Sequence, residues 1–305
     1  MSVLAPLAAQ LLHVALMLTA APAFAGWLTW LAARRAGTRG PPLRQPWTDL
    51  LRLLRKQPDT PESASCVFRL APVASFGVML AAAALVPSFT LGMAFAPQAD
   101  LVAIAGLLAL GRVVLVLAAM DAGTAPAGLA AGQMMTRATL VEPALWLIIL
   151  TLALLAGSSN LDLIAGLQLA GLLQPSAASV LAAAALAGLA FADIAEPPGR
   201  IQAAFSGTGL ALVQAASDLR LVIWLDLIGA LFLPWGMADA DAGPMLWLVG
   251  IASWVLRLLG FALVLTVIRT GLGQPRWRAL PAFLGVTTLL ALLAAMLVLA
   301  NTAAA

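Results

Sequence analysis

The sequence predicts an all-α integral membrane protein, a bundle of about eight transmembrane helices. Of its 305 residues, 63% are hydrophobic and only 10% are charged, and the mean hydropathy is +1.02. So few polar side chains cannot cover a soluble globule of this length, whereas a lipid-facing surface needs no polar cover. The apolar residues also form long uninterrupted runs, without the short alternating segments typical of a membrane barrel, which indicates helices.

Eight apolar runs approach or exceed the roughly 20 residues that a helix needs to cross the hydrocarbon core. They cover residues 4–33, 66–89, 100–119, 140–156, 176–192, 219–234, 245–268 and 281–300. A further hydrophobic segment, residues 161–173, is short and interrupted by Gly, so we expect a re-entrant or surface helix there. The whole chain, residues 1–305, is therefore expected to form a single membrane domain.

The positive charges predict the orientation of these helices. Lys and Arg flank alternate connections, namely at Arg34, Arg35, Arg39, Arg44, Arg52, Arg55, Lys56 and Arg69, then at Arg112 and Arg137, at Arg200 and Arg220, and at Arg269, Arg276 and Arg278. The other connections, residues 87–98, 157–175 and 238–244, contain no Lys or Arg and include Asp162, Asp239 and Asp241. By the positive-inside rule, the first set is cytoplasmic and both termini are periplasmic in a bacterial inner membrane.

The first cytoplasmic connection, residues 34–65, contains a predicted basic amphipathic helix. After Pro46, apolar residues recur at helical spacing at Trp47, Leu50, Leu51 and Leu54, while Asp49, Arg52, Arg55 and Lys56 mostly face the other way. Such a helix either rests on anionic headgroups or seats a soluble partner. The candidate docking residues are Trp47, Asp49, Arg52, Arg55, Lys56, Arg69, Asp121 and Arg200.

A carboxylate in the fourth apolar run is the first candidate for ion movement. The third run leads to Asp121, a loop of Gly, Ala and Thr follows, and the next run opens with Glu142 and Pro143 in its first turns. A charge at the bilayer centre costs about 2.5 to 3.5 kcal/mol on insertion scales, so Glu142 is expected to face other helices or trapped water. The alternative is an interfacial, hydrated Glu142 near Arg137.

No residue pattern indicates catalysis, a bound cofactor, a metal site or nucleic-acid binding. The single Cys66 excludes an intrachain disulfide and a self-contained Cys-ligated cluster. The single His13 lies in the first apolar run, where a packed or interfacial histidine is favoured over a haem or metal ligand.

Several short motifs, taken in order, resemble those of a known family. These are residues 45–56 (QPWTDLLRLLRK), 68–72 (FRLAP), 120–124 (MDAGT) leading to 142–145 (EPAL), 205–207 (FSG) with 210–212 (LAL), 232–236 (FLPWG) and 281–285 (PAFLG). The chain resembles the membrane anchor subunits of group 4 membrane-bound hydrogenases and formate hydrogenlyase, which have a counterpart among the membrane subunits of respiratory complex I. The resemblance covers most of the chain and implies the eight-helix, complex I-like fold of those subunits.

The resemblance implies a subunit with no redox centre of its own. A soluble arm would sit on its cytoplasmic face, made of hydrogenase-like large and small subunits with a nickel-iron centre and an iron-sulfur protein with its clusters. Antiporter-like membrane subunits would adjoin it in the bilayer. Electron transfer would be coupled there to proton or cation translocation.

Two residues match positions that the family pattern associates with ion movement. Glu142 matches the acidic residue of the family's fourth helix and is the first candidate protonation site. Arg257 corresponds to the family's intramembrane lysine, and because Arg is much harder to deprotonate we expect it to be a counter-ion.

The sequence also departs from the family pattern, because several carboxylates are missing. The long acidic connection between helices five and six is reduced to a few residues around Glu196 and Arg200, and Ala204 and Ala282 stand where the family has Glu. Gln133-Met134 replaces an Arg-Glu pair, and Arg269 replaces the Glu that closes helix seven. The residues that can replace part of this acidic path are Asp193, Glu196, Asp218 and Asp226, the last as a buried ion pair with Arg257.

The sequence therefore predicts a noncatalytic anchor subunit that docks a redox arm and couples it to ion movement. One alternative is a purely structural scaffold without ion conduction, and another is a complex I-type quinone-site subunit, which the shortened connection disfavours. A stand-alone transporter is disfavoured because the chain shows no inverted internal repeat.

Overall fold

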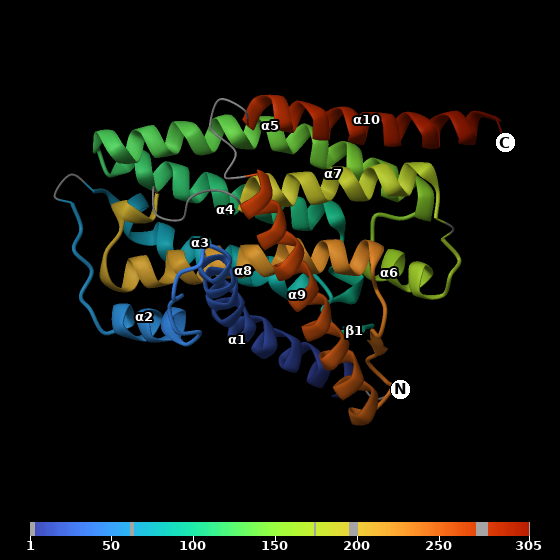
Figure 1. Cartoon of the computed structure of the whole chain (residues 1–305), viewed down its shortest axis with the longest axis horizontal. Coiled ribbons are helices and arrows are strands. Elements are labelled where there is room, and N and C mark those ends of the chain that lie inside the picture. The colour runs from blue at the N-terminus through green and yellow to red at the C-terminus, as the bar shows by residue number, and fades with distance from the viewer. Residues whose placement is uncertain (1–3, 62–63, 174, 195–200, 273–279, 305) are drawn as a thin grey trace.

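A computed structural model describes residues 4–61, 64–173, 175–194, 201–272 and 280–304, and these residues form a bundle of helices (Figure 1). The long helices are α1 (Leu4–Arg35), α3 (Cys66–Leu85), α4 (Leu101–Asp121), α5 (Ala125–Ala156), α7 (Ala177–Ile194), α8 (Gly207–Phe232), α9 (Pro244–Leu272) and α10 (Leu280–Ala304). The short ones are α2 (Gln45–Leu54), α6 (Leu161–Leu169), η1 (Ala96–Gln98) and η2 (Gln202–Ala204). The predicted all-α membrane fold is thus confirmed.

Seven of the eight long helices in the described part of the chain are long and apolar enough to cross a membrane, and α8 is the exception. α8 has 26 residues but carries Asp218, Arg220 and Asp226 along its middle. It contacts α1, α2, α3, α6, α7 and α9, so the other helices surround it. Among the described long helices, the one with the most charged residues is therefore the one that is most enclosed by other helices.

Two helices begin well before the predicted positions. α5 begins at Ala125 rather than at Leu140, and α8 begins at Gly207 rather than at Leu219. The first half of α5 is rich in Ala and Gly, and its buried residues, including Ala127, Ala130 and Ala131, pack in one cluster with residues of α3 and α4. Small side chains allow helix backbones to approach closely, and a search for strongly apolar runs misses such segments.

The end of the bundle near α6 contains a small parallel sheet that the sequence did not predict. β1 (Thr90–Leu91) pairs with β2 (Ala238–Asp239). The predicted short helix in residues 161–173 is α6, and both carboxylate oxygens of Asp162 accept the Gly92 N–H, at 3.1 and 3.3 Å. Burial raises the pKa of the Asp162 carboxyl, the bond from Gly92 lowers it, and the charge of Asp239 adds to the rise.

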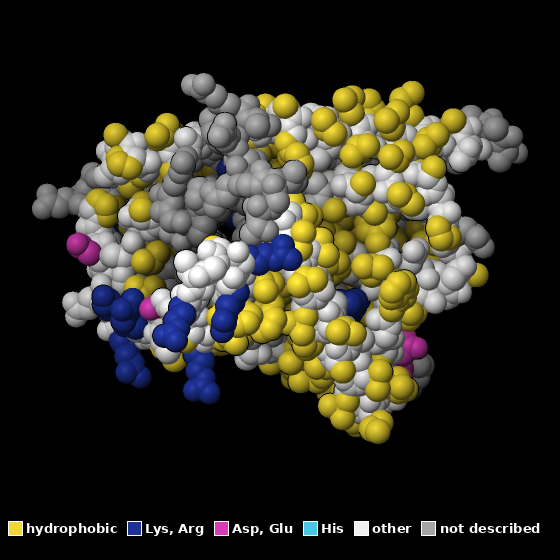
Figure 2. Space-filling view, viewed as in Figure 1, with side chains coloured by type: hydrophobic (Ala, Val, Ile, Leu, Met, Phe, Trp, Pro, Cys, Tyr) yellow, Lys and Arg dark blue, Asp and Glu magenta, His cyan; other side chains and the backbone are white. Residues whose placement is uncertain are grey.

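Exposed basic side chains gather at the opposite end, around α2 and the C-terminal end of α1 (Figure 2). The sequence assigned fifteen basic residues to cytoplasmic flanks, but Arg112 and Arg137 are buried inside α4 and α5. Exposed Asp239 and Asp241 lie at the end that holds β2. Figure 1 places the start of α1 and the end of α10 at the end opposite to α2.

Candidate functional site

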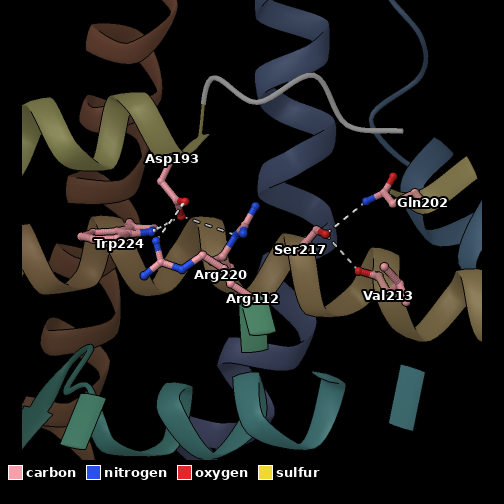
Figure 3. Close-up of polar contacts among 7 residues, drawn as sticks. All are labelled: Arg112, Asp193, Gln202, Val213, Ser217, Arg220 and Trp224. Atoms are coloured by element: carbon pink, nitrogen blue, oxygen red, sulfur yellow. Dashed lines mark hydrogen bonds and ion pairs between the residues drawn. The ribbon is translucent and has the colours of Figure 1, made fainter. Parts of the chain in front are cut away.

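A buried cluster of charges lies where α7 ends against α8. Asp193 is the penultimate residue of α7 and is only 2% exposed. Trp224 of α8 donates its indole N–H to Asp193 Oδ2 at 2.6 Å. Arg220 Nε lies 3.6 Å from the same oxygen, and Arg112 Nη1 of α4 lies 4.0 Å from Oδ1 (Figure 3). Asp193, Trp224, Arg220 and Arg112 are called the inner cluster below.

The inner cluster places one carboxylate in the field of several positive charges. Arg137 of α5 also acts electrostatically on Asp193. Arg112 is 4% exposed, and none of its three guanidinium nitrogens has a hydrogen-bond partner among the described residues. Burying a guanidinium without hydrogen bonds costs several kcal/mol, so packing alone does not explain Arg112. Its charge acts on the carboxylate instead.

A chain of polar groups continues from the inner cluster toward the basic end. Ser217 lies one turn before Arg220 on α8, donates to the Val213 carbonyl at 3.0 Å and accepts from Gln202 Nε2 of η2 at 3.1 Å (Figure 3). Its neighbour Asp218 accepts from Gln214 Nε2 at 3.2 Å, while its other oxygen is buried without a partner in the described part of the chain. Gln202 and Gln214 both line a cavity beneath α2.

A second buried cluster lies farther along α8, toward the opposite end. Asp226 Oδ1 accepts from Trp254 Nε1 of α9 at 2.8 Å, and its Oδ2 has no hydrogen-bond partner within the described ranges. Arg257 donates to the carbonyls of Ser88 and Leu233, at 2.6 and 2.9 Å. Arg257 and Asp226 interact electrostatically, without direct hydrogen bonding. Asp226, Trp254 and Arg257 are called the outer cluster below.

His13 of α1 is joined to the outer cluster through Ser88. Its Nε2 lies 2.8 Å from the Ala83 carbonyl, which only accepts, so Nε2 carries the proton. In the neutral ring Nδ1 then accepts from the Ser88 hydroxyl at 2.7 Å. His13 is completely buried, and the described residues contain no group of three or more His, Cys, Asp or Glu that could hold a metal. The geometry is that of a packed histidine.

The structure places three of the predicted ion-path residues in two clusters along α8 and leaves one apart. Asp193 lies in the inner cluster, and Asp226 and Arg257 in the outer cluster, all against α8. Glu142 is half-buried near the middle of α5 and makes no hydrogen bond or ion pair with the described residues. It is not in the first turns of its helix, because α5 begins at Ala125. Glu196 lies outside the described residues.

The docking candidates on α2 are arranged differently from the predicted pattern. Leu51 and Leu54 are 52% and 47% exposed, whereas Leu50 is buried and Leu53 half-buried. The inward face of α2 follows positions 46, 49, 50 and 53, so Asp49 lies on the inward side. Its carboxylate pairs with Arg52 at 3.0 Å. Trp47 is half-buried, and Arg52, Arg55 and Lys56 are exposed.

Asp121 has a local structural partner. Its Oδ2 accepts the backbone N–H groups of Ser65 and Phe68, at 2.8 and 3.1 Å, and the Ser65 hydroxyl at 2.8 Å. A carboxylate at the first turn of a helix stabilises it through these otherwise unpaired N–H groups. Asp121 thus fixes the start of α3, and Arg69 is exposed one turn later. Arg200 lies outside the described residues.

Sequence reasoning missed the roles of Arg112, Arg220 and Trp224. The alternation of charge presents Arg112 and Arg220 as orientation signals, although Arg112 falls well inside the run 100–119. A charged residue within a spanning segment is itself a reason to expect a functional site. That signal was present for Arg112, whereas Trp224 carried none, since indoles are common in membrane helices.

Comparison with known proteins identifies the family of the chain. The profile of a family described as NADH dehydrogenase matches residues 5–300. Hydrogenase-4 component C of Escherichia coli is 35% identical over 237 residues, covering 74% of each chain. Formate hydrogenlyase subunit 4 of the same organism is 29% identical, covering 95% of this chain and all of the relative.

The fold is also found in a solved structure. A chain of the membrane-bound sulfane sulfur reductase, an archaeal respiratory membrane complex, has a TM-score of 0.80 and 18% sequence identity. That likeness covers 95% of this chain and 98% of the other. Together with the family match and the two relatives, it confirms the resemblance drawn from the motifs. The chain therefore belongs to the NADH dehydrogenase family, and is a complex I-like, multi-pass membrane subunit of the hydrogenase-4 and formate hydrogenlyase type.

Proposed function

We propose that this chain is a noncatalytic anchor subunit that docks a soluble redox arm at its basic end and couples it to ion movement along α8. The observation that carries the coupling role is the series of buried and half-buried polar groups on or against α8, from Gln214 through the inner cluster to Asp226. Buried charges inside a membrane bundle are costly and mark ion paths or counter-ions. Apolar side chains at these positions would pack α8 more cheaply.

The docking role rests on the basic end and on the kind of complexes the relatives belong to. Hydrogenase-like large and small subunits and an iron-sulfur protein would sit against α2 and the exposed Arg69. Antiporter-like membrane subunits would adjoin the bundle in the inner membrane. The nickel-iron centre and iron-sulfur clusters would belong to those partners.

Within this proposal the carboxylates on or against α8 move the proton and the arginines hold its path. A proton wire requires titratable groups within hydrogen-bond reach of one another or of water. Asp218 and Asp226 each have one carboxyl oxygen that makes no hydrogen bond to the described residues. We propose that this oxygen takes up the proton. Arg112, Arg220 and Arg257 stay charged and act as counter-ions. Glu142 remains the candidate on α5.

Substitution of Asp193 in the intact complex tests the coupling role. Asp193→Asn keeps an acceptor for Trp224 but removes the charge, so we expect ion pumping per electron to fall about a hundredfold while the redox reaction continues. Glu142→Gln is expected to act in the same direction. Asp162→Asn is the matched control, because Asp162 lies on short α6 and its hydrogen bonds go to Gly92 and not to a residue of either cluster.

The scaffold alternative predicts a different result. If both variants assemble normally and pump as the unmodified complex does, ion conduction does not pass through this chain. Isolation of the native complex tests docking separately. Copurification without a hydrogenase-like large subunit or an iron-sulfur protein would contradict the anchor role.

A further inference from the structure

A cavity of about 550 Å³ lies between α1, α2, η2 and the first turns of α8. Its apolar lining includes Ala25 of α1, Pro46, Leu50 and Leu53 of α2, and Leu210 of α8. Sites of this volume hold small molecules in many proteins. The cavity lies at the basic end of the bundle and outside both clusters.

Most of the polar side chains that line the cavity are engaged with other groups, and Gln45, which is exposed, is the exception among the described residues. Gln202 donates its amide N–H to Ser217, and Gln214 donates to Asp218. Asp49 is paired with Arg52. With these groups engaged, the wall facing the cavity is mainly hydrocarbon. An apolar chain therefore fits the interior better than a polar headgroup does.

One wall of the cavity is held by a close approach between α1 and the segment that leads into α2. A Cβ atom at Gly26 would lie 2.7 Å from the Leu43 carbonyl oxygen and 3.1 Å from the Pro46 ring. Only glycine permits α1 and this segment to come so close. The space beneath α2 is therefore set by backbone contacts and is formed in advance.

Arg52 is the one basic side chain among the described residues that line the cavity, and further basic residues lie near it on or beside α2. Arg44, Arg52, Arg55 and Lys56 are exposed on or beside α2. Figure 2 shows basic side chains gathered at this end of the bundle. Leu51 and Leu54 are exposed on the same helix. A helix that mixes exposed leucines with basic residues is suited to the headgroup layer, where anionic lipids attract Lys and Arg.

We propose that this cavity binds one acyl chain of an anionic phospholipid whose phosphate lies against Arg52 at the rim. Arg52 lines the cavity and is largely exposed, so one side chain borders both the apolar interior and the headgroup layer. The lipid fills the space between α2 and α8 and fixes α2 on the bundle. The lipid itself carries no ion, although Gln214 in the cavity wall is also the start of the proposed ion path.

Native mass spectrometry of the full-length chain, taken from vesicles of equal amounts of phosphatidylethanolamine and phosphatidylglycerol, tests the proposal. We expect one retained phosphatidylglycerol per chain. Ala25→Trp fills the cavity and is expected to abolish retention. Arg52→Gln is expected to lower the preference for phosphatidylglycerol about fivefold, which corresponds to the loss of one basic contact. Arg69→Gln, an exposed arginine of α3 that does not line the cavity, is the matched control.

Three results would overturn the proposal. The first is that the unmodified chain retains no phospholipid, or retains a quinone instead when it is taken from native membranes. The second is equal retention by folded Ala25→Trp. The third is an equal lipid preference in Arg52→Gln and Arg69→Gln. This comparison tests the proposal even if Ala25→Trp does not fold.

Discussion

The residues that begin α8 show how single positions hold the site in place. The Ser206 hydroxyl accepts the Asp59 backbone N–H at 2.7 Å and lies 2.9 Å from the Asp59 carbonyl, to which it donates. Gly207 has φ +51°, and a Cβ there would clash with the Gln57 carbonyl group. The start of α8 is thus fixed to the segment that follows α2. This explains the Phe205-Ser206-Gly207 motif physically.

Gly207→Ala is therefore expected to destabilise the chain by about 1 to 3 kcal/mol, since it adds a left-handed non-glycine residue and a backbone clash. The measurement is thermal unfolding in detergent, together with protease sensitivity of residues 55–61. Gly209→Ala is the control, because its Cβ would meet the Pro72 ring at 3.4 Å, an ordinary contact. Equal stability of the two variants would show that the backbone at Gln57 shifts to accept the Cβ atom at little cost.

At the scale of whole helices, runs of apolar residues predict the bounds of most helices in the bundle. They fail where small or polar residues take the place of large apolar ones. The bounds of α3, α4, α7, α9 and α10 lie within a few residues of those expected. The hydropathy pattern predicts shorter versions of α5 and α8, because their first halves carry Ala, Gly, Gln and Ser, which interrupt a strongly apolar run but allow close packing.

The candidate site was predictable only in part for the same reason. Single charged residues such as Asp193 and Asp226 stand out against an apolar run. Their partners Arg112, Trp224 and Trp254 come from other helices or distant turns, so no sequence spacing joins them. Contacts of this kind depend on how the helices are rotated, which the hydropathy pattern does not determine.

The outer cluster joins three helices through one side chain. Arg257 of α9 donates to the carbonyls that follow α3 and α8, at Ser88 and Leu233. Arg257→Gln removes these charge-assisted bonds and leaves Asp226 buried without its counter-charge, which is expected to cost about 3 to 5 kcal/mol. Asp226→Asn keeps an acceptor for Trp254 and is expected to cost less.

A double-variant cycle measures this coupling. We expect Asp226→Asn to recover part of the stability lost in Arg257→Gln, because the uncompensated carboxylate is then absent. Thermal unfolding of the four proteins in detergent gives the interaction energy. Strict additivity would show that Arg257 acts only through the backbone carbonyls.

At the scale of the molecule, charge divides the bundle into two unlike ends. Exposed Arg and Lys residues lie around α2 (Figure 2). Exposed Asp239 and Asp241 lie at the end that holds β2. Burial of Arg112 and Arg137 removes two arginines from the surface count. The asymmetry remains, because the residues that flank α2 stay exposed. The positive-inside rule therefore still predicts the basic end in the cytoplasm.

Reporter fusions and cysteine labelling check this orientation directly. A cysteine at the exposed Lys56 is expected to resist a membrane-impermeant thiol reagent in intact cells, and one at Asp241 to react, in a chain whose own exposed Cys66 is replaced by Ser. Both termini are expected to report from the periplasm. The proposed docking of a cytoplasmic redox arm requires the basic end to be inside. If the cysteine at position 56 reacts in intact cells and the one at position 241 does not, the bundle has the opposite orientation. That result would contradict both the docking proposal and the placement of Arg52 at the inner headgroup layer.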